Sequence, residues 1–515
     1  FTVIVTSCLF CIMMFNYFEY EAPTACSSFL VSVGNDPDAL RRLFTSYTLA
    51  GTLFPLLCGI LADKATCPTV ILLLTVINFV GVICQSIGAD PKNRAEGVLR
   101  AGRFLMGLAC EAEQALMFAF VAKWFRYTTF PLTLMLLGIG ARIGELCMLL
   151  LVPAITNSIV SEGGSSVGIR VIEVQETLCI VSGAISVVCA AVLFVMHIGA
   201  HDHIRTSGVI RVSTREIHVP TQSRIDYQST TNSQRLTWAT FKRCLTRRFL
   251  IATFCTAVCY AGLIPLLNML PTAIKQDRWT SANYYLAVLI VVSIGCMGVA
   301  GIMCQRGKLI PVCMAGCMAQ TLAGFVLWWL STTYPDDSIP TDTTDAVSTT
   351  VSTLSTMIAG VSDHPEARFA MLVVALCLLG IALGSYAVGM WMLVVDACIA
   401  GPVPSLVGFS QCIQNIFILG CSLYFQRDTE EKAKSQYISD MMVMQGLGIL
   451  CLCLCVIAHL ERRKARRDMA LMRGRASRHR KGHKHTRSKS SSGHDDIDMI
   501  PLVASRRTPP RYRLG

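Results

Sequence analysis

Residues 101–151 read AGRFLMGLACEAEQALMFAFVAKWFRYTTFPLTLMLLGIGARIGELCMLLL. Two apolar runs flank a short basic segment at residues 123–126, which predicts two membrane-spanning helices joined by a tight turn. Glu111 lies midway along the first run and Arg142 midway along the second. Because both residues are equally far from the turn, an antiparallel hairpin places them at the same depth. A charged side chain at the bilayer centre costs about 2.5–3.5 kcal/mol on insertion scales, so this pair needs an explanation.

Two interpretations of the pair remain open. Glu111 and Arg142 can face a water-accessible cavity and form a substrate site. They can instead form a structural salt bridge, or Arg142 can pair with Glu145 one turn further along its own helix. Gly144 lies between these two residues and allows the backbone of a neighbouring helix to come close to the guanidinium.

Apolar side chains dominate the whole chain: 53% of its residues are hydrophobic and 15% are charged. That composition is too apolar for a soluble protein of 515 residues and is typical of a multi-pass membrane protein. A span needs about 20 mostly apolar residues, and twelve runs qualify. They are residues 1–18, 44–62, 70–88, 98–122, 130–153, 177–197, 249–271, 282–303, 309–331, 369–395, 404–425 and 438–460. The sequence therefore predicts an all-α polytopic membrane protein.

Basic residues are unevenly distributed over the segments between the spans. If both ends of the chain lie in the cytoplasm, most of the 45 Lys and Arg residues fall on the cytoplasmic side. The positive-inside rule favours this orientation and predicts cytoplasmic termini. The chain begins at Phe1 without Met and directly inside the first span, so we expect a truncated N-terminus.

A polar, basic segment at residues 199–248 separates two groups of six spans. It predicts a flexible cytoplasmic linker between an N-terminal half, residues 1–198, and a C-terminal half, residues 249–460. An interfacial helix is expected at residues 238–248, held by anionic lipid. These boundaries predict two six-helix halves joined in tandem.

Two further polar segments belong to the second part of the chain. Residues 332–368 form a long insertion rich in Ser, Thr and Asp on the predicted lumenal side, which can be disordered or can dock a partner. Residues 461–515 form a tail whose excess of basic residues matches the +12 net charge of the whole chain. Its composition predicts a disordered cytoplasmic tail. Twelve spans argue against a nucleic-acid role for this charge.

The 24 cysteines lie mostly inside apolar runs, as do Cys451, Cys453 and Cys455. Buried thiols behave there as small hydrophobic side chains. Because no Cys pair is spaced with a His as in a zinc site, the sequence predicts neither a metal site nor a disulfide framework. It shows no nucleophile–base arrangement and no phosphate-binding loop, so we expect neither an enzyme nor a cofactor.

The first span ends with Tyr17, Tyr20 and Glu21. Tyrosines at a span end are typical of an interfacial belt, which is the interpretation favoured for Tyr17. Tyr20 and Glu21 are candidates for the mouth of a cavity. In the second half, Pro265 predicts a bent or broken seventh span.

The second span ends in Gly59-Ile60-Leu61-Ala62-Asp63-Lys64. This pattern resembles the loop motif of the major facilitator superfamily, where the Asp can pair with a neighbouring helix and lock the outward-open state. The match is partial, because the pattern departs after Lys64 and the corresponding loop at residues 305–308 lacks an Asp. The resemblance implies a gating role for Asp63 and Lys64. Arg103, near the lumenal end of the fourth span, is a further gating candidate and can also snorkel to the interface.

The order and spacing of short motifs along the chain resemble the family of major facilitator superfamily domain-containing protein 1. The motifs are Tyr17-Phe18, Tyr20, Pro23, Gly102-Arg103-Phe104, Glu111, Trp124-Phe125, Ala141-Arg142-Ile143-Gly144, Tyr260, Pro265, Trp391, Phe409, Gln411 and Ile413-Gln414-Asn415. That family is similar to a lysosomal uniporter that exports dipeptides and works with a single-pass, heavily glycosylated lumenal partner. The resemblance implies a twelve-helix major facilitator fold, a lysosomal or vacuolar membrane with the plasma membrane as the alternative, and an accessory subunit.

A dipeptide carries an ammonium and a carboxylate at its two ends. Glu111 can bind the ammonium, and Arg142 can bind the carboxylate as a bidentate fork. The residues that can wall the cavity are Tyr20, Tyr47, Tyr260 and Trp391, and the amides that can either bind the peptide link or join helices are Gln411, Gln414 and Asn415. The alternatives are a carrier for a sugar or an organic anion, and a membrane sensor or scaffold that transports nothing.

Overall fold

The computed structural model describes twelve helices that are long and apolar enough to cross a membrane. The described residues are 2–25, 39–89, 95–125, 129–161, 167–206, 238–273, 279–333, 365–398, 402–425, 442–443, 445–464 and 467. The predicted all-α, twelve-span architecture is therefore confirmed. The insertion at 332–368, the linker at 199–248 and the tail at 461–515 lie mostly outside the described residues.

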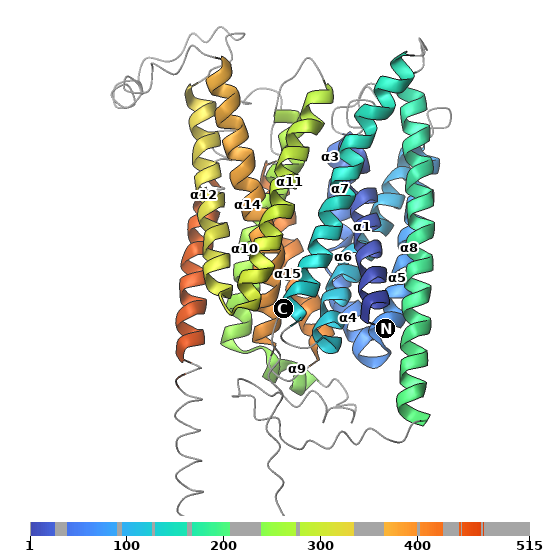
Figure 1. The fold of residues 1–515 in the computed structure, drawn as a ribbon, viewed down its shortest axis with the longest axis vertical. Helices are drawn as coiled ribbons and strands as arrows, with labels where there is room; N and C mark the ends of the chain where they lie inside the picture. The colour runs from blue at the N-terminus through green and yellow to red at the C-terminus, as the bar shows by residue number, and fades with distance from the viewer. Residues whose placement is uncertain are drawn as a thin grey trace, which may run out of the picture. The chain divides into compact units, whose positions relative to one another are not determined.

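The helices follow one another along the chain as Figure 1 shows. Their bounds are α1 Thr2–Ala25, α3 Ala39–Ala50, α4 Phe54–Lys64, α5 Cys67–Ala89, α6 Glu96–Trp124, α7 Phe130–Ser161, α8 Val167–Thr206, α9 Trp238–Cys244, α10 Arg247–Ala273, α11 Trp279–Gln305, α12 Leu309–Thr333, α14 Pro365–Ala397 and α15 Val403–Phe425. The last span, Gln445–Lys464, is called the terminal helix below. The short helix α9 falls in the segment predicted to hold an interfacial helix.

Helices from each part of the sequence pack mainly on one another. In the first part, α1 packs on α7 and α8, and α5 packs on α6 and α8. In the second part, α11 and α12 pack on α14, and α10 packs on α15. The two groups meet where α7 contacts α11 and where α4 contacts α15. Residues Leu460–Gly515 form a unit separate from Phe1–His459.

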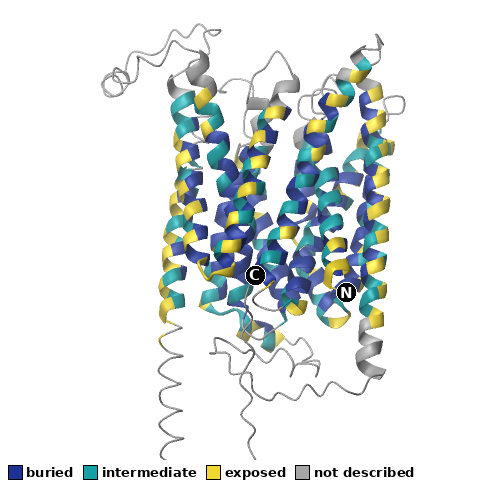
Figure 2. Ribbon diagram, viewed as in Figure 1, coloured by how far each residue is buried: buried dark blue, intermediate teal, exposed yellow. Residues whose placement is uncertain are grey.

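The outward faces of the helices are apolar. Figure 2 shows exposed residues along the outer side of the bundle, in the same view as Figure 1. On α8 these exposed residues include Val181, Val188 and Val195, whose exposed fractions are 51%, 61% and 64%. Large side chains of this kind face water at a cost, whereas lipid accommodates them. The exposed apolar faces therefore agree with a multi-pass membrane protein.

Glycines allow several helix pairs to approach at backbone distance. A Cβ added at Gly144 of α7 would overlap the Met14 carbonyl oxygen of α1 and lie 2.9 Å from the Phe18 nitrogen. A Cβ added at Gly107 of α6 would overlap the backbone of Tyr47 in α3. The expected close approach near Arg142 is thus confirmed, and it fixes α7 against α1.

Gly144→Ala is expected to destabilise the protein by about 1–3 kcal/mol, because the backbone of α1 cannot move away without repacking. The matched control is Gly298→Ala on α11, where an added Cβ meets nothing within 4 Å. Removing a helical glycine there stabilises by about 0.5–1 kcal/mol. Thermal unfolding of the purified variants measures both effects, and equal melting temperatures for the two variants would contradict this account of the α1–α7 contact.

The second span is not one continuous helix. It consists of α3 and α4, which a turn at residues 51–53 separates. Pro55 has no N–H, so the carbonyl of Gly51 lacks the donor that a continuous helix would provide. The side chain of Asn415 supplies that donor instead, with Nδ2 at 2.8 Å from the Gly51 oxygen. In the seventh span, where Pro265 predicted a bent or broken helix, α10 continues through that residue without a break.

Candidate functional site

A cavity lies between the two groups of helices. It has an empty volume of about 1170 Å³, which includes the space at its opening. The candidate residues that line it are Tyr20, Tyr47, Glu111, Arg142, Tyr260, Trp391, Gln414 and Asn415. Their helices are α1, α3, α6, α7, α10, α14 and α15. The structure therefore brings eight of the nine predicted binding residues to one cavity. Gln411 is not among the lining residues.

Glu111 is held by amides from the other end of the sequence. Gln411 Nε2 donates to Glu111 Oε2 at 2.5 Å, and Asn415 Nδ2 donates to the same oxygen at 3.2 Å. Asn415 also donates to the Gly51 carbonyl, so one amide contacts both α6 and the break in the second span. Gln411 and Asn415 thus join helices, which is one of the two roles that the sequence left open for these amides. Gln414 lines the cavity, and its Oε1 atom is buried without a hydrogen-bond partner.

Arg142 has a partner on its own helix. Its Nη1 donates to Glu145 Oε2 at 2.5 Å, one turn further along α7. The guanidinium carbon also lies 5.1 Å from the centre of the Tyr17 ring, within the range of a cation–π contact. Glu111 and Arg142, both described, do not form an ion pair with each other. Of the structural alternatives, pairing of Arg142 with Glu145 is the one observed.

Tyr17, Glu21 and Glu145, to which no binding role was assigned from the sequence, are among the other residues that line the cavity. The assignment of Tyr17 to an interfacial belt is wrong, because its ring packs on the Arg142 guanidinium. The placement of Glu21 at the cavity is confirmed. Glu145 was considered only as a partner of Arg142, because sequence spacing says nothing of the cavity beside it.

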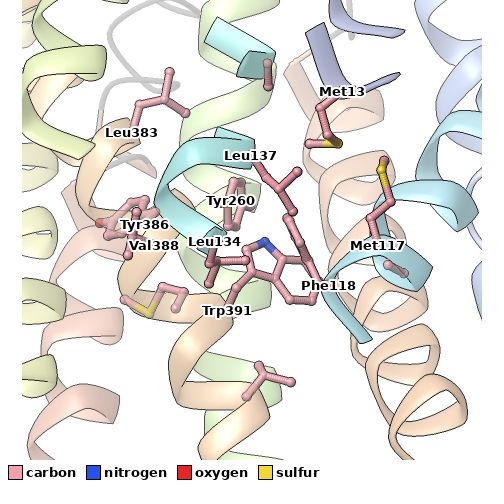
Figure 3. Close-up of a cluster of buried hydrophobic side chains, with 14 of the residues drawn as sticks. Met13, Met117, Phe118, Leu134, Leu137, Tyr260, Leu383, Tyr386, Val388 and Trp391 are labelled. Atoms are coloured by element: carbon pink, nitrogen blue, oxygen red, sulfur yellow. The ribbon is translucent and has the colours of Figure 1, made fainter. Parts of the chain in front are cut away.

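Aromatic rings also line the cavity. Figure 3 shows Trp391 close to Phe118 and Tyr260 among apolar side chains of the core. The ring centres of Trp391 and Phe118 are 5.0 Å apart, which links α14 to α6. Tyr20 and Tyr47 meet at 4.9 Å in an edge-to-face arrangement that favours packing. The predicted aromatic lining is therefore present in both groups of helices.

Arg103 does not reach a surface. Its side chain is 0% exposed, so it does not snorkel to the interface, which was one of the two roles considered. Its Nη2 donates to the Tyr20 carbonyl at 3.0 Å and its Nη1 to the Glu19 carbonyl at 3.4 Å. The Glu19 carbonyl lacks a helical donor because Pro23, four residues on, has no N–H. The guanidinium also lies 5.2 Å from the centre of the Tyr47 ring. Arg103 therefore holds the end of α1 beside the cavity.

Asp63 joins α4 to the start of α15. Its Oδ2 accepts hydrogen bonds from the Ser405 N–H at 3.1 Å and from the Ser405 hydroxyl at 2.5 Å. A carboxylate at a helix N-terminus satisfies free N–H groups and interacts favourably with the helix dipole. Lys123 Nζ lies 3.5 Å from Asp63 Oδ1. The base that meets Asp63 is therefore Lys123, whereas Lys64 is exposed and has no ion pair among the described residues.

Asp63→Asn is expected to loosen the contact between α4 and α15, because it removes the charge at the start of α15 and the pairing with Lys123. A loss of about 1–2 kcal/mol shifts the opening equilibrium roughly 5- to 30-fold. Cys412 reports this opening, since its buried sulfur accepts a hydrogen bond from the Leu56 N–H of α4. We expect faster maleimide labelling of Cys412, measured by peptide mass spectrometry.

The control for this measurement is Lys64→Gln, which leaves the Asp63 contacts in place. We expect it to label Cys412 at the rate of the unmodified protein. Equal labelling of Asp63→Asn and the unmodified protein would show that these contacts do not hold the two helices together.

Two buried carboxyl groups that are absent from the candidate set and from the cavity lining, Glu19 and Glu113, lie inside the first group of helices. Glu19 and Glu113 are both 0% exposed and accept hydrogen bonds from neutral side chains. The donors, at 2.5–2.9 Å, are Asn16 and Thr75 for Glu113, and Asn78 and Ser182 for Glu19. Asn16 and Glu19 share one face of α1, which is the signal that sequence reading could have used. The network ties α1 to α5, α6 and α8.

Comparisons with known proteins agree on the fold. The family model described as Major Facilitator Superfamily matches residues 6–451. The structure is similar to that of the proton:xylose symporter XylE bound to 6-bromo-6-deoxy-D-glucose, with a TM-score of 0.64, 12% identity and coverage of 88% of this chain and 94% of that one. FucP in the outward conformation gives a TM-score of 0.56 at 11% identity, with 87% and 98% of the chains covered. No curated protein matches the chain by sequence.

A third similar structure is the human organic anion transporter MFSD10. It gives a TM-score of 0.54 at 10% identity, and the match covers 88% of this chain and 99% of that one. At such identities these similarities establish the fold and leave the solute to be argued from the site.

Proposed function

Because the chain belongs to the major facilitator superfamily, and is thus a membrane transporter, we propose that it carries dipeptides and binds them by both charged termini. Glu111 binds the ammonium and Arg142 binds the carboxylate. The observation that carries this proposal is that both side chains line one cavity, each held by a partner within the protein. A substrate group can take the place of each partner as it binds.

Arg142 has room for a carboxylate. Glu145 accepts a hydrogen bond from only the Nη1 of Arg142, and the Nε of Arg142 is buried without a hydrogen-bond partner. The edge of the guanidinium formed by Nε and Nη2 matches the two oxygens of a carboxylate. A buried donor without a partner costs about 1–3 kcal/mol, so a substrate that supplies an acceptor gains that amount.

The charges of the cavity favour a substrate with an ammonium group. Three carboxyl residues and one guanidinium line it: Glu21, Glu111, Glu145 and Arg142. Buried carboxylates need a compensating positive charge, and Arg142 can compensate only one of them. An organic anion adds a further negative charge, whereas a dipeptide zwitterion adds no net charge and supplies an ammonium group for one of the carboxylates. The site therefore supports a zwitterionic solute, and a basic dipeptide more than an acidic one.

A sugar is the weaker candidate. Neutral solutes rich in hydroxyl groups are bound by amide side chains, and the cavity has amides on α15. Of these, Asn415 already donates a hydrogen bond to Glu111, as does Gln411 behind the lining. Gln414, and Gln114 of α6, also line the cavity, and Gln414 can bind the peptide link of a dipeptide.

The proposal is tested by stabilisation and uptake with purified protein. Dipeptides are expected to raise the melting temperature, because a ligand at 100 times its Kd stabilises by about 2.7 kcal/mol. A hexose, a dicarboxylate and a free amino acid serve as comparisons, and uptake into proteoliposomes follows for the solutes that stabilise. Stabilisation by the hexose or the dicarboxylate alone would refute the dipeptide assignment. Uptake that survives deletion of residues 468–515 separates transport from a scaffold acting through its tail.

We further propose uniport in a lysosomal or vacuolar membrane, with both termini cytoplasmic. The resemblance of the cavity residues to a lysosomal dipeptide uniporter supports this location, and the loop charges support the orientation. A fluorescent tag at the C-terminus tests both statements. Its co-localisation with an organelle marker tests the membrane, and its quenching by a quencher added from the cytosol tests the orientation of the C-terminus. A signal confined to the plasma membrane would contradict the location.

The insertion at 332–368 is expected to dock a lumenal accessory subunit. The chain contains no Asn-x-Ser/Thr acceptor, so it carries no N-linked glycans of its own to protect its loops. A long polar segment facing proteases gains protection from a covering partner. Deletion of residues 338–362 is therefore expected to remove a co-purifying protein and to shorten the half-life of the carrier. Unchanged partners and turnover would show that the insertion is only tolerated.

A further inference from the structure

Six sulfur atoms converge in the second group of helices, where α10, α12, α14 and the terminal helix meet. Cys255 Sγ lies 3.5 Å from Cys451 Sγ and 3.3 Å from Cys455 Sγ. Cys317 Sγ of α12 lies 3.3 Å from Cys451 Sγ and 3.8 Å from Cys455 Sγ. Figure 1 shows the terminal helix alongside α12, as these contacts require. Cys255 and Cys317 therefore each lie within contact distance of the same two sulfurs of the terminal helix.

Two more sulfurs complete the group, which we call the sulfur cluster. The Sγ atoms of Cys259, Cys317 and Cys451 all lie within 4.8 Å of one another, and those of Cys255, Cys451 and Cys455 form a second such triad. Met390 Sδ of α14 lies 3.8 Å from Cys255 Sγ. All six side chains are 0% exposed. The helical spacing of four residues between Cys255 and Cys259, and between Cys451 and Cys455, puts each pair on one face.

The donor set selects a soft cation. Thiolate and thioether sulfur prefer Cu(I), Zn(II) and iron–sulfur centres over hard cations. Charge decides among these in an apolar interior: Zn(II) with four thiolates leaves a net charge of about −2, whereas Cu(I) with two thiolates leaves about −1. A neutral thioether such as Met390 adds a ligand without adding charge. Cu(I) therefore costs least to bury here.

The geometry also suits a three-coordinate ion. Metal–sulfur bonds of about 2.3 Å in a planar trigonal site hold the sulfurs about 4 Å apart. The sulfurs observed at 3.3–3.8 Å need to move outward by only a few tenths of an ångström. We propose that the sulfur cluster binds one Cu(I) ion, with Cys451 as the ligand shared by both triads. Two cysteines bind as thiolates, and the third sulfur ligand, a thiol or the Met390 thioether, stays neutral. Binding therefore releases two thiol protons for each ion, and the cluster changes from neutral to a charge of −1.

Such a site ties the terminal helix to α10 and α12. Thiols that only fill space behave as small hydrophobic side chains and need no sulfur-to-sulfur contacts. Here sulfurs from four helices meet at one point, as metal ligation requires. The bound ion therefore stabilises the packing of the last span, independently of the solute that the cavity accepts.

The test uses the full chain, expressed with copper in the medium and purified without oxygen in detergent. We expect about one copper per chain by elemental analysis, and X-ray absorption showing sulfur ligands alone at about 2.3 Å. Cys451→Ala and Cys455→Ala are each expected to lower the copper content about tenfold or more, since loss of a ligand weakens the remaining site. The matched control is Cys453→Ala, because Cys453 is exposed on the same helix and its loss leaves the copper content unchanged.

Size-exclusion profiles identify variants that fail to fold. If Cys451→Ala or Cys455→Ala fails to fold, Cys317→Ala is measured in its place. Retention of zinc in place of copper, absence of any metal, or a disulfide between two of these cysteines in mass spectra would each overturn the proposal. Copper that persists in every folded variant would overturn it as well. Dipeptide uptake by the copper-free protein is a separate measurement, so failure here leaves the proposed transport function untouched.

Discussion

Arg142→Lys is expected to lower dipeptide uptake about 30- to 150-fold, corresponding to the 2–3 kcal/mol of a hydrogen bond to a charged group. Lys keeps the positive charge, but its ammonium cannot present two parallel N–H donors to one carboxylate. It also remains within reach of Glu145, so the internal partner competes more successfully with the substrate. Uptake into proteoliposomes at a dipeptide concentration below KM measures the change directly.

Arg100→Lys is the matched control for that experiment. Arg100 lies on α6, is partly exposed and pairs with Glu96 at the surface, away from the cavity. Exposed ion pairs contribute only about 0–1 kcal/mol, so this variant is expected to transport normally. Glu111→Gln keeps the shape of the side chain and removes the charge that binds the ammonium. Its dipeptide uptake is expected to fall as far as that of Arg142→Lys. Near-normal uptake in both site variants would leave Glu111 and Arg142 with a structural role only.

The second large effect is expected when a terminal charge of the dipeptide is blocked. N-acetylated and C-amidated dipeptides are expected to inhibit uptake about 100-fold less well than the free dipeptide, because each block removes one terminal charge and leaves a buried partner without it. Competition assays with a labelled dipeptide measure the inhibition constants. Equal inhibition by blocked and free dipeptides would contradict recognition through the termini.

Combining variants with blocked substrates separates the two ends of the site. The Arg142→Lys variant is expected to lose its discrimination against the amidated dipeptide and to keep that against the acetylated one. The Glu111→Gln variant is expected to show the reverse. Additive losses in both variants would mean that the two residues do not each contact one terminus.

Much of the fold follows from the sequence because a membrane leaves few choices. Apolar runs of sufficient length predicted the twelve spans, and all twelve are present. The equal distance of Glu111 and Arg142 from one turn predicted that they lie at the same depth, with a shared cavity as one of two interpretations. Both residues line one cavity. The pairing of Arg142 with Glu145 was one of the alternatives read from the sequence, and it is observed. The partners of Glu111 did not follow from the sequence, since Gln411 and Asn415 reach it from a helix some 300 residues away.

The remaining misses share one physical cause: spacing along a helix says which residues share a face and is silent on what covers that face. Tyr17 was placed at an interface, yet its ring packs on Arg142. Lys64 was expected to act beside Asp63, yet Lys123 supplies the charge. The break in the second span had a local signal in Pro55, which an average over apolar residues conceals. Cys317 lies far from the cysteines of the terminal helix in sequence, so only packing reveals the sulfur cluster.

The amides on Glu111 and the carboxylate on Arg142 bear on how the carrier returns after releasing its cargo. A carrier whose site charges are bare when empty must bury them unpaired to change state, and this cost confines it to exchanging one solute for another. Here each charge already has an internal partner in the absence of substrate. We therefore expect a lower electrostatic cost of reorientation for the unloaded form than for a carrier with bare charges. Under the proposed function, this arrangement favours net downhill flux without a counter-substrate.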